Sequence, residues 1–534
     1  MHNPRPVTHK ILVLDPLSER GLERLRAAGD FEVDFRPGLS EGELVAVIPP
    51  YHALVVRSGS KVTATVLEAG RSLKVVGRAG IGVDNVNVGA ATRLGIVVMN
   101  SPRGNAVTTA EHAISLLLSL ARHIPQACES VKSGKWERPR FQGREIDGKI
   151  LGVVGLGNIG RHVAEKARGL GMKVLAFDPV VTPERAEQLH VRLAHTVDEL
   201  LEGSDFVTLH VPLTDSTRNL IDAKAIARMR PGALLVNASR GGIVDEAALY
   251  DALLGGRLGG AALDVFSEEP PKGSPLLSLG NVIATPHLGA STEEAQERVA
   301  VEIADQVIAY LRDGIIQNAV NVPTVSAEKA PKLAPYLALS RALGSLLAQL
   351  DVQGLREIHV ECAGAAAELG ATGITNEAVA SVLGQFLDFG VNAVNAPFVA
   401  AERGVRVVEI KGTSAGGYEG LVTVAIRGRG SERIASGTCL PGGPRVVSLD
   451  GHDLDVRPEG VLLLLVNEDR PGVIGAVGTI LGTRSVNISR MQVGLKHGST
   501  DAMGVFNVDS PVPDDAMEEI RRMPATRSVV QVRL

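Results

Sequence analysis

The sequence predicts an α/β fold with two doubly wound parallel sheets, followed by a mixed α+β region and a small βαββαβ unit. Three observations support this prediction. Short apolar runs of strand type alternate with amphipathic helical segments through most of the first 311 residues, as in parallel sheets covered on both faces. The pattern changes at residues 317–323, which have the composition of an exit linker. The last stretch, residues 460–534, follows the order strand, helix, strand, strand, helix, strand.

The first hundred residues are expected to form a parallel sheet of their own. Strands are predicted at residues 10–14, 31–35, 53–57 and 73–76, with a helix at 18–28 that Gly29 closes. An apolar helix follows at 106–120, with Glu111 and His112 near its start. We interpret it as a buried helix between domains or subunits rather than a catalytic element. Because the first unit precedes a nucleotide-binding motif, it is the candidate substrate-binding domain.

That motif is the sequence Gly-Leu-Gly-Asn-Ile-Gly at residues 155–160, between an apolar run at 149–154 and a helical segment. Gly155 permits a tight turn, Gly157 lets the backbone approach a pyrophosphate, and Gly160 allows close packing of helix on strand. The phosphates would lie at the positive N-terminus of the helix. A second apolar run, 172–177, ends at Asp178, whose carboxylate can accept hydrogen bonds from ribose hydroxyls and would repel a 2′-phosphate. The sequence therefore predicts NAD rather than NADP as cofactor.

The alternation of strands and helices continues after this motif. Strands are predicted at 205–211, 233–238, 261–265 and 281–285, and a long helix at 291–311 is expected to cross back to the first domain. Polar stretches at 237–245, 261–270 and 285–289 lie at strand ends. Because ligands of open α/β sheets bind outside the carboxyl ends of the strands, these stretches are expected to converge on the nicotinamide.

Three side chains in these stretches suit hydride transfer from a hydroxy acid. Arg240 offers a guanidinium fork that matches a carboxylate. His287 offers an imidazole that can take the hydroxyl proton, and Glu269 can bond its other ring nitrogen and stabilise the imidazolium. Each residue alone also fits a structural role, because an arginine beside a glycine turn is often a surface cation and a histidine after proline often caps a loop.

The remaining chain divides into two parts. From residue 326 to about 454, helices are predicted at 332–350 and 376–389, with a β-hairpin around 428–430, and no catalytic constellation is evident. In the last part, strands are predicted at 461–466, 488–495, 502–508 and 528–534, and helices at 472–482 and 514–522. This order is the ferredoxin-like arrangement.

Composition excludes several classes of protein. A chain of 534 residues is too long for one core and predicts three or four domains. A net charge of −5 gives no reason to propose nucleic acid or an anionic membrane as a partner. The three cysteines are scattered without CxxC spacing, so neither a disulfide framework nor a metal site is predicted. The first six residues lack an apolar signal core, and no run of about 18 apolar residues occurs. We expect a cytoplasmic protein.

Taken together, these motifs resemble those of the D-2-hydroxyacid dehydrogenases. The resemblance rests on the glycine motif, Ala-Ser-Arg-Gly-Gly-Ile-Val-Asp-Glu from Ala238, Asp-Val-Phe from Asp264 with Glu-Pro at Glu269, and Thr-Pro-His-Leu-Gly-Ala from Thr285. More narrowly, residues 77–86 and 135–138 resemble the D-3-phosphoglycerate dehydrogenases, in their long form with an intervening domain and a C-terminal ACT domain. The resemblance implies a flavodoxin-like substrate domain and a Rossmann domain for NAD.

The resemblance also implies a role for individual residues. Arg240, Glu269 and His287 correspond to the catalytic residues of the family. Its cofactor contacts correspond to Gly155, Gly157, Asn158, Ile159, Gly160, Asp178, Val211, Ala238, Ser239, Arg240, Asp264, His287, Leu288, Gly289 and Ala290. Its substrate phosphate and carboxylate region corresponds to Arg57, Arg78, Gly80, Gly82 and Arg240. Trp136 and Arg138 are expected to reach the site of a neighbouring subunit.

In the ACT-like unit, Asp469 and Asn487 match the positions at which the family binds serine between paired domains. Position 467 is Asn, where relatives often have an aromatic residue. A purely structural role in dimerisation is the alternative for this unit. The family and the ACT module both suggest a homotetramer that is a dimer of dimers.

The implied activity is NAD-dependent oxidation of D-3-phosphoglycerate to 3-phosphohydroxypyruvate, the first step of the phosphorylated route to serine, with feedback by serine. The alternatives are another D-2-hydroxyacid dehydrogenase, such as a hydroxypyruvate or glyoxylate reductase, and a non-catalytic sensor of NAD and an amino acid. The expected domains are substrate-binding (1–100 and 291–322), NAD-binding (101–290), intervening (323–456) and ACT (457–534).

Overall fold

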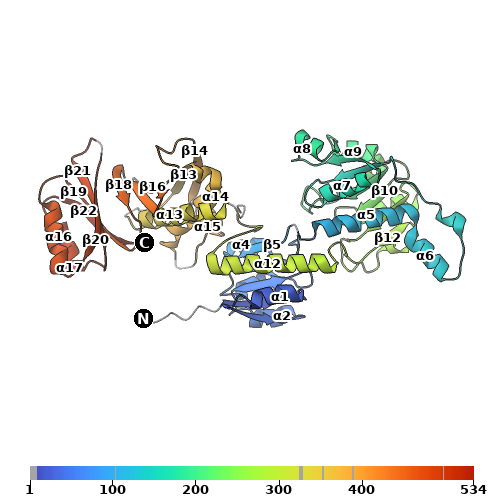
Figure 1. Cartoon of the computed structure of the whole chain (residues 1–534), viewed down its shortest axis with the longest axis horizontal. Helices are drawn as coiled ribbons and strands as arrows, with labels where there is room; N and C mark the ends of the chain where they lie inside the picture. The colour runs from blue at the N-terminus through green and yellow to red at the C-terminus, as the bar shows by residue number, and fades with distance from the viewer. Residues whose placement is uncertain (1–8, 103, 324–328, 351–353, 388–389, 497) are drawn as a thin grey trace.

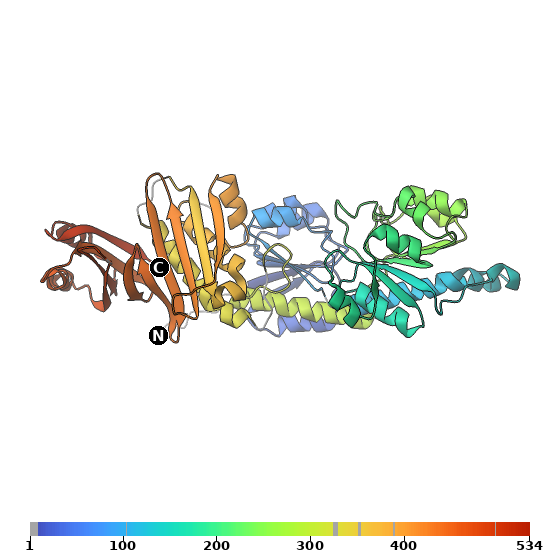
Figure 2. The same cartoon turned by 90° about the horizontal axis from the view of Figure 1, so that it is seen from above.

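The computed structural model describes residues 9–102, 104–323, 329–350, 354–387, 390–496 and 498–534. The six N-terminal residues considered above for a signal sequence lie outside this part. Four units follow one another along the long axis of the molecule, and the C-terminal unit and the nucleotide-binding unit lie at opposite ends (Figures 1 and 2). None of the helices in the described ranges is both long and apolar enough to cross a membrane.

The first unit is a parallel five-stranded sheet in the order β2-β1-β3-β4-β5, the flavodoxin-like order. Its strands are β1 (His9–Val13), β2 (Phe31–Phe35), β3 (Ala53–Val56), β4 (Val75–Arg78) and β5 (Val97–Asn100). Its helices are α1 (Glu19–Arg26), α2 (Glu41–Val47), α3 (Ala64–Ala69), α4 (Val88–Arg93) and α12 (Glu293–Asp313). The four predicted strands are found, whereas β5 and helices α2–α4 were not predicted.

Helix α12 returns from the second unit and covers the first sheet, as predicted (Figure 1). Thr292 caps its N-terminus by accepting a hydrogen bond from the backbone of Ala295, and Gly314 ends it in the left-handed conformation. Ile303 and Val307 of this helix come so close to Gly77 of β4 that a Cβ there would lie within about 3.0 Å of both.

The predicted linker at residues 317–323 is bonded to the first sheet rather than free of it. The backbone N–H of Val320 donates to Val98, and that of Asn100 donates to Asn318. The Asn321 side chain also accepts from the backbone of Val98 and donates to Ile96. This segment therefore extends the pairing along β5, because that edge strand has backbone groups left to satisfy.

The second unit is a parallel seven-stranded sheet in the order β12-β11-β10-β9-β6-β7-β8, the Rossmann order with one added strand. Its strands are β6 (Ile150–Val154), β7 (Lys173–Phe177), β8 (Arg192–Leu193), β9 (Phe206–Leu209), β10 (Leu234–Asn237), β11 (Gly260–Leu263) and β12 (Val282–Ala284). Its helices are α5 (Ala106–Arg122), α6 (Ile124–Lys132), α7 (Gly160–Gly169), α8 (Pro183–Gln188), α9 (Val197–Gly203), α10 (Ala223–Arg228) and α11 (Glu246–Leu254), with 3-10 turns at Arg138–Phe141 and Pro275–Ser278. Apart from the short β8, each strand matches a predicted one to within two residues at each end.

The third unit is a mixed six-stranded sheet in the order β14-β13-β15-β16-β17-β18. Its strands are β13 (Glu357–Gly364), β14 (Arg406–Gly412), β15 (Gly420–Arg427), β16 (Glu432–Leu440), β17 (Gly443–Leu449) and β18 (His452–Val456), and its helices are α13 (Ala330–Ala348), α14 (Ala365–Gly384) and α15 (Ala396–Glu402). The predicted hairpin is β15–β16. The helix predicted at 376–389 is the second half of the longer α14, and residues 388–389 lie outside the described part.

The fourth unit is an antiparallel sheet in the order β20-β21-β19-β22 with two helices on one face, which confirms the predicted ferredoxin-like fold. Its strands are β19 (Val461–Glu468), β20 (Ile488–Leu495), β21 (Asp501–Val508) and β22 (Thr526–Arg533), and its helices are α16 (Val473–Thr483) and α17 (Asp514–Arg521). Leu462, Leu464 and Val505 on the other face belong to the core of the third unit.

Candidate active site

The glycine motif forms the turn between β6 and α7 as predicted. Gly155 has a φ of +94°, and a Cβ there would meet the backbone oxygen of His210 at 2.5 Å. A Cβ at Gly160 would meet the oxygen of Gly155 at 1.8 Å, so α7 can pack on the turn only without a side chain. The Cβ position of Gly157 faces open space, which leaves room for a ligand to approach the backbone.

Asp178 lies at the end of β7, beside this turn. Its carboxylate accepts hydrogen bonds from the backbone N–H of Leu156 at 2.8 Å and of Val180 at 3.0 Å. Each carboxylate oxygen has a second lone pair, so Asp178 can hold the turn and still accept a ribose hydroxyl. Val211 also borders the turn, since a Cβ at Gly155 would lie 2.9 Å from its Cγ1.

His287 and Glu269 form a hydrogen-bonded pair in the second unit. The Nδ1 atom of His287 lies 2.8 Å from Oε2 of Glu269, and the other oxygen of Glu269 accepts the backbone N–H of Phe266. Burial tends to raise the pKa of Glu269, but the hydrogen bond and charge of His287 and the Phe266 N–H outweigh it, so this pKa lies below its ordinary value. An ionised Glu269 fixes the proton of the neutral imidazole on Nδ1 and leaves Nε2 as an acceptor.

Asp264 is the buried anchor of the loop that carries His287. Its side chain is 1% exposed, and its carboxylate accepts from the Thr285 hydroxyl at 2.6 Å and from the backbone N–H groups of Leu288 and Gly289 at 2.8 and 2.9 Å. His112 of α5 approaches the same carboxylate, with Nε2 at 3.1 Å. Burial favours a higher pKa for Asp264, but these hydrogen bonds prevail and lower it.

Arg240 follows β10 in a loop that Asn237 organises. The Asn237 side-chain oxygen accepts from both the backbone N–H and the hydroxyl of Ser239, and its amide donates to the Arg240 carbonyl at 2.9 Å. The Arg240 guanidinium reaches the first unit, where its Nε donates to Oδ2 of Asp84 at 2.8 Å. The loop therefore places a cation at the cleft between the two sheets.

Two further arginines face the cleft from the first unit. Arg57 follows β3, and its backbone N–H donates to the buried Asp15 carboxylate at 2.5 Å. Arg78 ends β4 and packs over Gly80, where a Cβ would lie 1.7 Å from its Nη1. Burial, and then repulsion from Arg240, lowers the pKa of Arg78 to about 10. Its Nε is buried without a hydrogen-bond partner, which is the state expected of a group that receives an anionic ligand.

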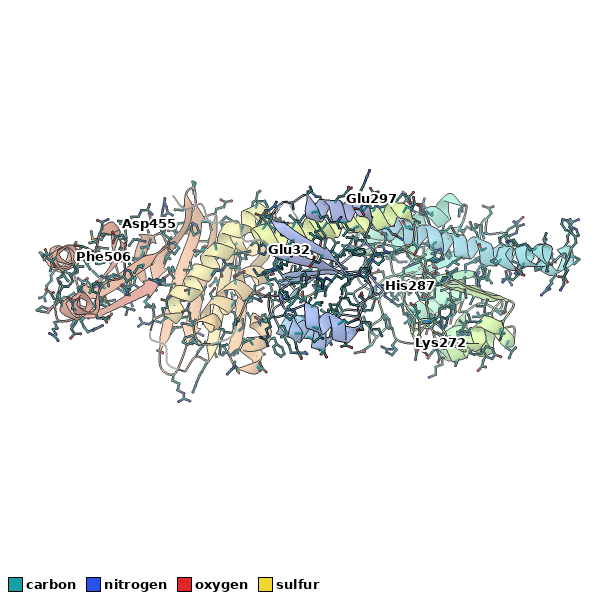
Figure 3. The ribbon with its side chains drawn as sticks, turned by 90° about the horizontal axis from the view of Figure 1, so that it is seen from below. Glu32, Lys272, His287, Glu297, Asp455 and Phe506 are labelled. Carbon is teal, nitrogen blue, oxygen red and sulfur yellow. The ribbon has the colours of Figure 1, made fainter. Side chains whose placement is uncertain are left out.

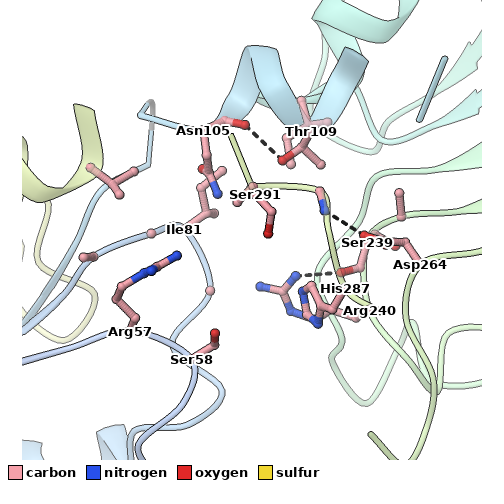
Figure 4. Close-up of a pocket in the computed structure, with 18 of the residues that line it drawn as sticks. Arg57, Ser58, Ile81, Asn105, Thr109, Ser239, Arg240, Asp264, His287 and Ser291 are labelled. Atoms are coloured by element: carbon pink, nitrogen blue, oxygen red, sulfur yellow. Dashed lines mark hydrogen bonds between the residues drawn. The ribbon is translucent and has the colours of Figure 1, made fainter. Parts of the chain in front are cut away.

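One pocket brings most of the predicted residues together (Figure 4). It lies between the two units, and His287 is seen at this junction in Figure 3. The predicted residues that line it are Arg57, Arg78, Gly80, Gly82, Ile159, Ala238, Ser239, Arg240, Asp264, His287, Gly289 and Ala290. Glu269 does not line this pocket and is connected to it through its hydrogen bond to His287. The other predicted cofactor residues, Gly155, Gly157, Asn158, Gly160, Asp178, Val211 and Leu288, are outside this lining.

The pocket also contains residues that the sequence did not single out. Ser58, Asn105, Thr109 and Ser291 line it, and the side-chain oxygen of Asn105 is buried without a hydrogen-bond partner. The sequence places Asp84 within the motif at residues 77–86 but predicts no role for it. No local pattern identifies these residues, because their positions depend on how the two units meet.

Asp469 and Asn487 are exposed and lie at opposite ends of α16. This helix has 11 residues, so it is roughly 16 Å long. One copy of the chain therefore does not bring the two predicted effector residues together. Helix α6 lies at the far end of the molecule (Figure 1). Trp136 and Arg138 follow it in the chain, and Trp136 is 79% exposed.

Family models match three parts of the chain. Residues 114–289 match the NAD-binding domain of D-isomer specific 2-hydroxyacid dehydrogenases, which confirms the predicted cofactor. Residues 332–450 match the intervening domain of D-3-phosphoglycerate dehydrogenase, and residues 461–525 match the ACT domain.

Relatives match almost the whole chain. The D-3-phosphoglycerate dehydrogenase of Synechocystis is 44% identical over 98% of this chain and 95% of its own length. The enzyme of Methanocaldococcus jannaschii is 42% identical over 98% of this chain and all of its own length. The enzyme of Bacillus subtilis is 40% identical over 97% of this chain and 98% of its own length.

Solved structures match the first two units. The TT0316 protein of Thermus thermophilus is 34% identical with a TM-score of 0.54, covering 58% of this chain and 99% of its own. A glyoxylate reductase from Paecilomyes thermophila is 27% identical with a TM-score of 0.54, covering 59% and 98%.

Proposed function

Because the chain belongs to the D-3-phosphoglycerate dehydrogenases, within the D-2-hydroxyacid dehydrogenase family, we propose that it oxidises D-3-phosphoglycerate at C2 to 3-phosphohydroxypyruvate with NAD. This reaction opens the phosphorylated route to serine. The observation that carries the proposal is one pocket in which His287, bonded to Glu269 behind it, lies together with three arginines.

The three arginines suit a substrate with two anionic groups. Arg240 approaches from the second unit beside His287 and suits the carboxylate next to the reacting carbon. Arg57 and Arg78 approach from the first unit and suit the phosphate, which lies at the other end of a three-carbon substrate. An unphosphorylated hydroxy acid would leave these two arginines without an anion.

The residues present fit NAD. The open Cβ position of Gly157, the tight turn at Gly155 and the carboxylate of Asp178 are the features that a dinucleotide requires at this turn. When bound, NAD supplies the hydride acceptor. Of the protein's own groups, Arg240 orients the substrate carboxylate, and Nε2 of His287 takes the proton of the C2 hydroxyl. Glu269 then stabilises the imidazolium through Nδ1.

Regulation and assembly form part of the same proposal. The ACT domain supports a small-molecule effector, and serine, the end product of the route, is the one we propose. Because Asp469 and Asn487 are far apart in one chain, the effector would bind between two copies.

The exposed Trp136, Ile124 and Val131 support an oligomer that pairs through the α6 region. Trp136 and Arg138 would then be directed to the neighbouring subunit, and we propose a dimer of dimers. We also propose a cytoplasmic location and the domain division given by the sequence.

The proposal is tested by following NADH absorbance with purified protein, NAD and D-3-phosphoglycerate, with hydrazine present to trap the ketone product. We expect sustained turnover with one NADH formed for each substrate consumed. The absence of NADH would favour a non-catalytic sensor, and turnover of glyoxylate or hydroxypyruvate alone would favour the other reductases of the family.

A further inference from the structure

We propose that Asp84 is a positioning residue that holds Arg240 across the cleft, so that the terminal nitrogens of Arg240 face the substrate carboxylate. This inference rests on the proposed function, because it gives Asp84 a part in the same reaction. Asp84 lies in the loop after β4 of the first unit, whereas Arg240 lies in the loop after β10 of the second.

The hydrogen bonds of Arg240 divide its guanidinium into two halves. Its Nε donates to Oδ2 of Asp84 at 2.8 Å, and its Nη1 donates to the carbonyl of Ser239 at 2.6 Å. A guanidinium has five N–H groups, so two are used and three remain, two of them on Nη2. The protein thus fixes the plane of the guanidinium through Nε and Nη1 and leaves the N–H groups of Nη2 available for a ligand. Figure 4 shows Arg240 beside His287 in the pocket.

The charge of Asp84 suits this task. Arg240 and Arg78 point into one pocket and repel each other. The charge of Arg240 lowers the pKa of Arg78, and the charge of Asp84 raises it. Without a carboxylate at this position, repulsion would favour movement of the long Arg240 side chain into solvent. Asp84 itself is 63% exposed, so its replacement removes little packing.

Gly82 supplies an independent argument for the same arrangement. A Cβ at position 82 would lie 1.8 Å from Nη2 of Arg240 and 2.7 Å from Oδ2 of Asp84. Gly82 has no left-handed φ, so alanine fits its backbone. The Gly82→Ala variant would therefore act by displacing Arg240 from Asp84.

The test measures steady-state kinetics of D-3-phosphoglycerate oxidation for the full-length protein. Asp84→Ala is expected to raise KM for the substrate by about tenfold or more, because a charge-assisted hydrogen bond to the binding group is lost. We expect kcat and the KM for NAD to stay within about threefold of the wild type. Asp84→Asn is expected to give a KM for the substrate between those of the wild type and Asp84→Ala, because its amide oxygen can still accept from Nε of Arg240. Gly82→Ala should resemble Asp84→Ala.

A double variant and a matched control make the inference falsifiable. In an Arg240→Ala background, Asp84→Ala should leave kcat/KM unchanged, because Asp84 acts through Arg240. Glu68→Gln removes an exposed carboxylate from α3 of the same unit and should match the wild type. An unchanged KM for Asp84→Ala, a lower KM, or a further loss in the Arg240→Ala background would each overturn the inference. Absence of turnover by the wild type would instead overturn the proposed function.

Discussion

Glu269 and His287 lie 2.8 Å apart, from the Oε2 atom of one to the Nδ1 atom of the other, at the edge of the cleft between the first two sheets. The backbone N–H of Phe266 holds the second oxygen of Glu269, so the carboxylate cannot turn away. The pair therefore sets both the direction and the tautomer of the imidazole. Asp264 fixes the loop beneath it through two backbone N–H groups.

Replacement of His287 by alanine is expected to lower kcat by about 10²- to 10⁴-fold, because no other group in the pocket can take the hydroxyl proton as well. Stopped-flow or steady-state NADH formation measures this loss, and fluorescence titration should show a much smaller change in NADH binding. His195→Ala, on an exposed surface of the same unit, is the control. Turnover near the wild-type value would refute the assignment of His287.

The pH dependence of Glu269→Gln tests the pair. The pKa of Glu269 is lowered from its ordinary value of 4.5, so its carboxylate is ionised and the wild-type pair persists at every pH of a normal assay. Without this negative charge the imidazolium loses its stabilisation. The acid limb of the kcat/KM profile should therefore move to lower pH, with a lower plateau. A limb at the wild-type midpoint would contradict the pairing.

Arg57 is expected to contribute to recognition of the phosphate. Arg57→Ala should raise KM for D-3-phosphoglycerate by about 10- to 100-fold, because a charge-assisted hydrogen bond to a dianion is lost. The KM for D-glycerate should change by less than about twofold, since that substrate has no phosphate. Arg71→Ala, an exposed arginine of the same unit, serves as the control. If the reactions with the two substrates were weakened equally, Arg57 would support the fold rather than bind the phosphate.

Asp178 is expected to determine the preference for NAD over NADP. Asp178→Asn keeps an acceptor for the backbone N–H of Leu156 but removes the charge that repels a 2′-phosphate. We expect the kcat/KM ratio of NAD to NADP to fall by about tenfold or more. Asp178→Ala would also weaken the turn and reduce use of both cofactors. A ratio unchanged in Asp178→Asn would place the discrimination elsewhere.

The predicted serine site can be tested by complementation between chains. Asp469→Ala and Asn487→Ala should each abolish inhibition by serine, while turnover without serine stays at the wild-type level. If each site takes Asp469 from one copy and Asn487 from another, a mixed pair of the two variants regains one intact site. Coexpressed variants should thus recover part of the serine response. Inhibition that survives in either single variant would exclude this site.

Most of the fold could be predicted because its signals are local. The glycine turn, the apolar strands of the second sheet and the order of the C-terminal unit each lie within a short window of sequence. Strand β5 was missed although it is as long as the predicted β3 and β4 and follows the turn residue Gly95. Helices α2–α4 were missed because they have only six or seven residues each. Patterns this short give little periodicity.

The site was predictable where residues belong to motifs, as Arg240, Glu269 and His287 do. Asp84 and His112 could not be assigned because their partners are distant in sequence: Asp84 bonds a residue 156 positions away, and His112 bonds Asp264. Such relations arise from the way units pack, which no local pattern records.

This pocket is expected to oxidise a phosphorylated hydroxy acid. The most direct test compares kcat/KM for D-3-phosphoglycerate and D-glycerate with NAD, under one set of conditions. The arrangement of Arg57, Arg78 and Arg240 predicts a preference of about 100-fold or more for the phosphorylated acid. Equal or better use of D-glycerate would contradict the account.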